Sequence, residues 1–194
     1  MKATGMYTVS VKEGALVEAC GTGDDIVFTL YRISFYAESG GQVGETGVIT
    51  NDSCTIRVLD TTKNAAGVFI HKAVVEEGFL REGDTVEAVV DVERRRAIMR
   101  NHTAAHLLQA ALRSVLGDHV EQAGQLVNEN AVRFDFTHFS ALTDEELLAV
   151  ENLVNEKILE DIKVECREMT LEEAKKLGAM ALFGEKYGDV VRVV

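Results

Sequence analysis

The segment that decides how this chain folds is NHTAAHLLQAALRSVLG, residues 101–117. The spacing of its apolar side chains predicts one amphipathic helix that ends at Gly117. At about 100° per residue, one side of that helix carries the polar residues His102, Thr103, His106, Gln109 and Arg113. The opposite side carries Ala104, Leu107, Leu108, Ala111, Leu112 and Val115. We expect the aliphatic side to be buried and both imidazoles to face one cleft.

The two histidines of this helix are four residues apart, so they lie one turn apart and both rings can reach one metal ion. Solvated polar faces show the same spacing, and spacing alone leaves both interpretations open. The zinc-protease version of this motif needs Glu beside the first His as general base, and Thr103 stands there instead. Two imidazoles leave a tetrahedral ion two ligands short, and those must come from elsewhere.

Composition places the chain among globular proteins. Hydrophobic residues make up 46% of its 194 residues, enough for one large domain or two small ones. The chain has no apolar run near ~18 residues and no signal-peptide pattern, which predicts a cytoplasmic protein without a membrane partner. A net charge of −12 argues against broad coating of nucleic acid but not against a local basic patch. Cys20, Cys54 and Cys166 form no Cys-x-x-Cys pair, which predicts buried thiols in a reducing compartment and no disulfide framework.

The first part of the chain is rich in Val, Ile and Thr. The expected strands are 7–11, 15–20, 26–31, 47–50, 54–59, 68–75 and 85–90. Their close spacing predicts a small barrel or sandwich. Between them lies the glycine-rich segment FYAESGGQVGETG, residues 35–47. It lacks the Gly-Lys-Ser/Thr of a P-loop, and Ser39 stands where a dinucleotide fingerprint needs a third glycine. We therefore expect a tight turn with positive φ.

A change from strand to helix is predicted near residue 91. Asp91 is placed to cap a helix whose first turns carry Arg94, Arg95, Arg96 and Arg100. Two interpretations of these arginines remain open: bidentate contacts to phosphate, or pairing with the surplus of carboxylates.

After Gly117 the apolar period changes to two. Segments 119–127 and 131–136 predict a β-hairpin. Thr143 with Glu146 forms a capping box for a helix that runs to about residue 161. Thr170 with Glu173 forms another, for a short helix that ends at Gly178, and strands are expected at 164–169 and 190–194. The predicted fold class is α+β, with a β-barrel-like domain at 1–91 and an α+β domain at 92–194.

Three segments together resemble the editing region of alanyl-tRNA synthetases. They are FYAESGGQ at 35–42, RNHTAAHLL at 100–108 and GAMALFGEKYG at 178–188. The resemblance implies a small N-terminal β-barrel, followed by the α+β editing domain shared with threonyl-tRNA synthetase and free-standing alanyl editing proteins. It also implies an activity, hydrolysis of the ester that joins serine or glycine to alanine tRNA. The implied partners are the acceptor end of that tRNA and the rest of the parent synthetase, whose amino-acid-activating core has no counterpart here.

Position by position, His102 and His106 match the first two zinc ligands of that family. Its other two come from a Cys-x-x-x-His element after the terminal strand, and residues 1–194 stop before it. We therefore expect this chain to hold zinc weakly or not at all, with a fold that stands without the metal.

The resemblance also assigns a substrate pocket. Gln122 is the candidate catalytic residue and is placed to hydrogen-bond a serine hydroxyl. Arg100, Thr103 and Ala105 are the other candidate substrate-binding residues. Ala105 departs from the usual Thr, which bears on serine/alanine discrimination, and Ser34 departs from a usual proline. Two alternatives are a catalytically silent module that binds the tRNA acceptor end and an independent trans-editing protein, and the missing Cys-x-x-x-His argues against the second.

Overall fold

The computed structural model describes residues 3–5, 10–12, 15–32, 34–179 and 188–194. The chain has the predicted α+β class and divides into two compact units. The first unit comprises Met1–His106 and Gly124–Asp135, and the second comprises Leu107–Ala123 and Phe136–Val194. The domain boundary predicted at residue 91 falls between a strand and a helix, and stays a prediction.

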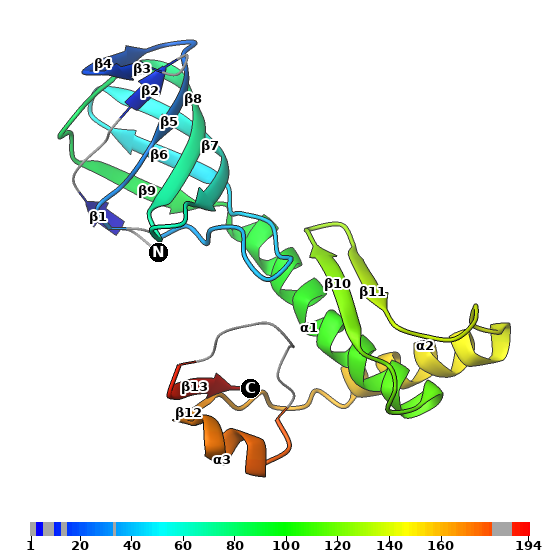
Figure 1. Ribbon diagram of the computed structural model, residues 1–194. Coiled ribbons are helices and arrows are strands. Elements are labelled where there is room, and N and C mark those ends of the chain that lie inside the picture. The colour runs from blue at the N-terminus through cyan, green and yellow to red at the C-terminus, as the bar shows by residue number, and fades with distance from the viewer. Residues whose placement is uncertain (1–2, 6–9, 13–14, 33, 180–187) are drawn as a thin grey trace. The chain divides into compact units, whose positions relative to one another are not determined.

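The first unit is built on a nine-stranded antiparallel sheet that curls around its core (Figure 1). Its strands are β1 (Ala3–Gly5), β2 (Ser10–Lys12), β3 (Ala15–Val17), β4 (Ala19–Gly21), β5 (Asp25–Phe28), β6 (Gly47–Asn51), β7 (Cys54–Lys63), β8 (Phe69–Arg81) and β9 (Val86–Val90). Among the described residues the hydrogen-bonded path runs β1-β9-β6-β7-β8-β5-β2-β3, with β4 paired to β8. Closure of this sheet into a barrel stays a prediction.

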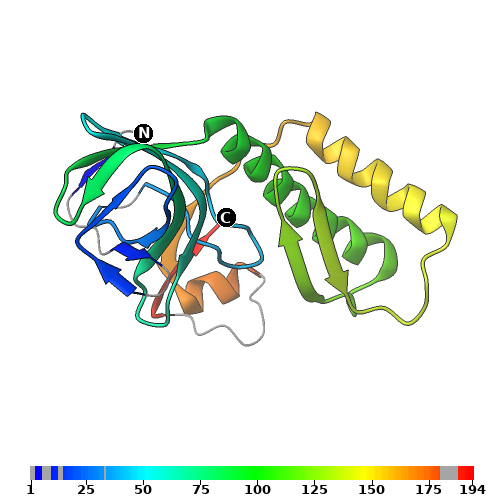
Figure 2. The ribbon, with the colours of Figure 1, turned by 90° about the horizontal axis from the view of Figure 1, so that it is seen from above.

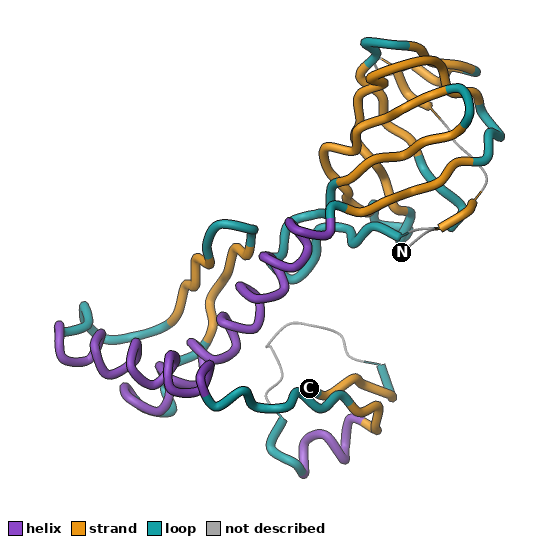
Figure 3. Tube along the Cα trace, turned by 180° about the vertical axis from the view of Figure 1, so that it is seen from behind, coloured by secondary structure: helices purple, strands orange, loops and turns teal. Residues whose placement is uncertain are grey.

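The core of the first unit is made mainly by residues that alternate along these strands, together with Leu30 and Phe35 from the segment between β5 and β6. Figure 3 shows the strands wrapped around it. Its members are Cys20, Ile26, Phe28, Leu30, Phe35, Ile49, Cys54, Ile56, Val58, Ala73, Val75, Leu80, Val86, Ala88 and Val90. This alternation is the period-two pattern that predicts strands with one buried face.

The expected strands at 54–59 and 68–75 are longer in the structure. Both continue because bulges keep the two strands paired past the positions where the alternation breaks. Gly78, with φ of 79°, lies so close to Ser53 that a Cβ there would be 1.8 Å from the Ser53 carbonyl oxygen. The strand expected at 15–20 divides into β3 and β4. Part of the strand expected at 7–11 lies outside the described residues.

Helix α1 (Val92–Leu116) is continuous through the two segments that the sequence treats separately. The Asp91 carboxylate accepts a hydrogen bond from the Arg94 backbone N–H at 3.0 Å, which confirms the predicted cap, and Gly117 ends the helix with φ of 114°. The sequence places Gln109 on the polar side of this helix, opposite the side expected to be buried, and this prediction is wrong. It is buried, because the inward-facing stripe of α1 runs through Ile98, Ala105, Gln109 and Leu112.

The hairpin consists of β10 (Gln122–Val127) and β11 (Val132–Phe136). Its Gly124–Asp135 part belongs to the first unit, and Figure 2 shows the hairpin next to α1. The second unit also holds α2 (Asp144–Leu159), β12 (Arg167–Thr170), α3 (Leu171–Lys176) and β13 (Val190–Val193), and β12 pairs antiparallel with β13. Both capping boxes are present, at Thr143 and at Thr170. No helix in the described part of the chain is both long and apolar enough to span a membrane.

Candidate functional site

The imidazoles of His102 and His106 lie on one side of α1. Their rings are stacked, with centroids 5.3 Å apart and planes 6° from parallel. His106 is exposed, while His102 is half-buried. Burial, and second the charge of His106, lower the pKa of His102 below its ordinary value. The shift favours the neutral imidazole, which is the form that binds a metal or accepts a proton.

The side chain of Gln42 reaches His102 from the glycine-rich segment. The His102 Nδ1 atom lies 2.6 Å from the Gln42 Oε1 atom, across 60 residues of sequence. Gln42 belongs to a turn in which Ser39 and Gln42 exchange backbone hydrogen bonds of 3.2 and 3.0 Å. Gly40 and Gly41 at its centre have φ of 59° and 79°, which confirms the expected tight turn with positive φ.

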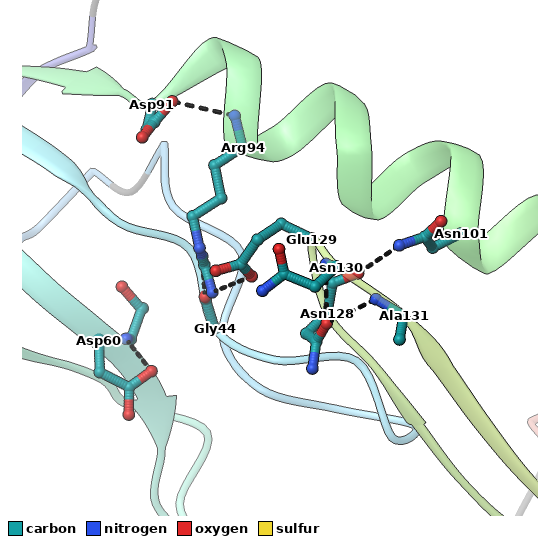
Figure 4. A network of polar contacts seen from close by, with 10 residues as sticks. Gly44, Asp60, Asp91, Arg94, Asn101, Asn128, Glu129, Asn130 and Ala131 are labelled. Carbon is teal, nitrogen blue, oxygen red and sulfur yellow. Dashed lines mark hydrogen bonds and ion pairs between the residues drawn. The ribbon is translucent and has the colours of Figure 1, made fainter.

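The glycine-rich segment is fastened to α1 by two arginines. Arg95 forms an ion pair with the buried Glu45 carboxylate and also donates to the Ser34 carbonyl at 2.9 Å. Arg94 donates to the Gly44 carbonyl at 2.8 Å and pairs with Glu129 at 3.1 Å, as Figure 4 shows. The hydrogen bond and charge of Glu45 raise the pKa of Arg95.

These contacts favour pairing with carboxylates for part of the arginine cluster. Arg94 and Arg95 hold the fold together, and Arg96 lies 3.3 Å from Glu93. Pairing with carboxylates therefore accounts for these three arginines. Arg100, which also lies on α1, is exposed.

The remaining candidate residues have different environments. Thr103 is exposed, and its hydroxyl donates to the Met99 carbonyl at 3.0 Å. Ala105 is buried at 2% exposure. Gln122 is the first residue of β10, is half-buried and belongs to the second unit. The substrate-binding roles of all these residues stay predictions.

Zinc is the metal that the sequence implies, and the two histidines fit part of its preferred donor set. They offer two neighbouring imidazoles, while Gln42 holds one ring nitrogen of His102 and leaves the other free. Within the described ranges, no three His, Cys, Asp or Glu side chains gather closely enough to hold a metal ion. The expected burial of the thiols is confirmed for Cys20 and Cys54 but is wrong for Cys166, which is exposed and whose Sγ atom accepts a hydrogen bond from Arg192 at 3.2 Å. The third resembling motif, 178–188, lies largely outside the described residues.

Gln42 is the last residue of the resembling segment at 35–42, but the sequence alone predicts no role for it. Glutamine occurs commonly on protein surfaces, and no local spacing signals a partner 60 residues away. Glu45 was missed for the same reason. One signal in the sequence indicated its ion pair. Glu45 is a carboxylate in a glycine-rich loop, and a helix that carries several arginines follows later in the chain.

Comparison with known proteins gives one consistent group. A family model described as tRNA synthetases class II (A) matches residues 1–94. The alanine–tRNA ligase of Acetivibrio thermocellus is 54% identical over 193 residues, that of Staphylococcus saprophyticus 48% over 194, and that of Desulfitobacterium hafniense 50% over 183. These matches cover 100%, 100% and 94% of this chain, but 22%, 22% and 21% of the relatives. The chain thus spans about a fifth of the length of these relatives.

Proposed function

Because this chain belongs to the alanine–tRNA ligase family, we propose that it is the module that edits mischarged alanine tRNA. The reaction is hydrolysis of the ester in serine- or glycine-charged alanine tRNA. The observation that carries the proposal is the imidazole pair on α1, with His102 held by Gln42 from the glycine-rich turn. The three segments that resemble the family's editing region support the same assignment.

The physics of amino-acid selection explains why such a ligase needs a second site. A pocket shaped for alanine cannot exclude the smaller glycine, and it rejects one extra hydroxyl only weakly. Discrimination in such pockets reaches about 10- to 200-fold, and a hydrolytic site that removes the wrong product supplies the remainder.

Each residue of the proposed site has a role that its environment permits. His102 and His106 would hold the zinc ion, which when bound polarises an ester carbonyl or a water molecule. The neutral state of His102, favoured by its burial, leaves a ring nitrogen with a free lone pair. The resemblance gives Gln122 the role of offering an amide to the hydroxyl of a serine ester, which a glycine ester lacks. Arg100, exposed on α1, offers a charge to a tRNA phosphate.

Deacylation of serine-charged alanine tRNA by the full-length ligase tests the proposal. Replacement of an outer partner of a zinc ligand typically costs about 10- to 100-fold, so His102→Ala should cost at least that much. His138→Ala is the matched control, because His138 is also a histidine of this chain paired with another, His119, at 2.9 Å. Undiminished deacylation by His102→Ala contradicts the proposal. Retained tRNA binding without hydrolysis by the wild type supports the silent binding module.

The role of Gln122 has its own test. In the full-length ligase, Gln122→Ala should slow hydrolysis of the serine ester more than that of the glycine ester. Equal slowing of both esters removes Gln122 from the selection of serine, while leaving the imidazole pair as the proposed centre.

A further inference from the structure

We propose that Gln42 is a positioning residue that fixes the tautomer of His102. An amide oxygen only accepts hydrogen bonds, so the 2.6 Å contact between Gln42 Oε1 and His102 Nδ1 requires the proton on Nδ1. In a neutral imidazole the other nitrogen, Nε2, then carries the free lone pair. His102 is thereby prepared as an Nε2 ligand or proton acceptor before anything binds.

Gln42 is able to do this because its backbone is fixed from two sides. Within the turn it exchanges hydrogen bonds with Ser39. On its outer side it bridges to Val127 of β10: the Val127 N–H donates to the Gly41 carbonyl at 2.8 Å, and the Val43 N–H donates to the Val127 carbonyl at 3.1 Å. Gln42 thus lies in an additional short parallel pairing with the hairpin.

The close approach of the turn to the hairpin explains its second glycine. A Cβ added to Gly41 would lie 2.5 Å from Gln125 Cγ and 2.6 Å from the Gln125 carbonyl oxygen. The Gln125 amide also donates to the Gly40 carbonyl at 2.6 Å. A residue with a side chain at position 41 would therefore push the turn, and Gln42 with it, away from the hairpin.

The helix that carries His102 is tied to the same hairpin. Next to His102, the Asn101 amide donates to the Asn128 carbonyl at 2.7 Å (Figure 4). Arg94, two turns earlier, pairs with Glu129 and donates to Gly44. The turn, the hairpin tip and α1 form a closed set of contacts within the first unit, so the Gln42–His102 distance is set by the fold.

The tautomer inference stands on the contact itself, and only its consequence for zinc rests on the proposed function. A ring held through Nδ1 presents Nε2 in one direction, which reduces the freedom that is lost when a metal binds. The pairing of a ligand histidine with an oxygen acceptor has this effect at many metal sites.

The direct test is the tautomer of His102, read by nitrogen NMR of the side chain in metal-free protein at about pH 8, where histidines are neutral. Wild type should show Nδ1 protonated. Gln42→Met, which keeps the length and removes the acceptor, should shift His102 toward a mixture of tautomers. Gln42→Glu, which restores an acceptor oxygen, should keep the wild-type pattern. Unchanged signals from His71, buried in the sheet, show that each variant is folded.

A second readout is zinc affinity of the full-length ligase, by competition with a chelator. Gln42→Met should weaken it by about 10- to 100-fold and Gln42→Glu should restore it. A wild-type His102 protonated on Nε2, or a tautomer unchanged in Gln42→Met, overturns the inference. Absence of serine-ester hydrolysis would overturn the proposed function alone, because the NMR result does not depend on activity.

Discussion

The two units of this chain place the same amino acid in different surroundings: Ile56 of β7 is 0% exposed, whereas Ile158 of α2 is 52% exposed. The contrast extends beyond one residue. The core cluster lies entirely within residues 20–90. On α2, Leu147, Leu148 and Leu159 are all at least half exposed, and only Val150 is buried.

An amphipathic pattern therefore predicts a helix more safely than it predicts which of the helix's side chains are buried. The apolar positions of α2 follow the helical period, yet most of them contact solvent in this chain. Burial of apolar area is the main stabilising contribution in a small domain. We therefore expect the free energy of unfolding to be concentrated in the sheet of the first unit.

The largest expected loss of stability comes from a pair of isoleucine substitutions, one in each unit, that tests this contrast in burial. Ile56→Ala should lower the free energy of unfolding by about 4 kcal/mol, because it leaves a cavity among fully buried neighbours. Ile158→Ala should lower it by less than about 1 kcal/mol, since half the side chain is already in water. Urea unfolding followed by circular dichroism measures both. If the two substitutions lowered the free energy of unfolding by similar amounts, the second unit would have a core that stabilises it as much as the sheet core stabilises the first.

Carboxylates give the next comparison. Glu45 is buried at 5% exposure, pairs with Arg95 and accepts a hydrogen bond from the Tyr36 N–H at 2.8 Å. Glu45→Gln should cost about 3 kcal/mol, because Arg95 then loses its counter-charge in a partly buried position. Glu160→Gln, which breaks an exposed pair with Lys157 on the second unit, should cause no measurable change. Urea unfolding again decides, and a costly Glu160 substitution would contradict the contrast.

The free energy of unfolding should depend on pH because of His71, a buried residue of the first unit. Burial lowers the pKa of His71 from 6.5 to about 4. Between those values the unfolded chain binds a proton that the native protein does not, so stability is full above pH 6.5 and falls as the pH drops toward 4. The 2.5-unit difference corresponds to about 3 kcal/mol at 1.36 kcal/mol per unit.

The check is urea unfolding of wild type and His71→Phe between about pH 7 and 4. The difference between the two proteins isolates His71 from the carboxylates that also titrate. The His71 side chain stacks on Phe28 with centroids 5.2 Å apart, so an aromatic replacement keeps most of its packing. Equal pH slopes for both proteins would contradict the assignment.

Local chemistry explains which parts of the fold were predictable. The capping boxes at Thr143 and Thr170, the cap at Asp91 and the stop at Gly117 each depend on residues within a few positions, and all are present. The lengths of β7 and β8 were not predictable, because bulges depend on the partner strand. Gln109 was misplaced because helical period gives a face only to within a residue or so, and neighbouring elements set its rotation.

The candidate site divides in the same way. The stacking of His102 on His106 follows from a spacing of four residues on a helix. The contact between Gln42 and His102 depends on how a turn, a hairpin and a helix meet. Sequence resemblance pointed to both segments as important, but it did not say that they touch.

The smallest expected effect is the loss of stability when a helix cap in the second unit is removed. The helix concerned is α2, whose apolar side chains are mostly exposed and whose start is held by a capping box. The Thr143 hydroxyl accepts a hydrogen bond from the Glu146 N–H at 3.2 Å, and the Glu146 carboxylate accepts one from the Thr143 N–H at 2.8 Å. Thr143→Ala should destabilise α2 by about 1 kcal/mol, because the Glu146 N–H at the start of the helix loses its acceptor. Thr103→Ala is the matched control, since Thr103 lies inside α1, where alanine is the better helix former by a few tenths of a kcal/mol.

Hydrogen exchange of the α2 amides should rise about fivefold in Thr143→Ala alone, in line with the 1 kcal/mol loss. A rise spread equally over the sheet would mean that the two units unfold together, and the comparison between them would then fail as a statement about stability.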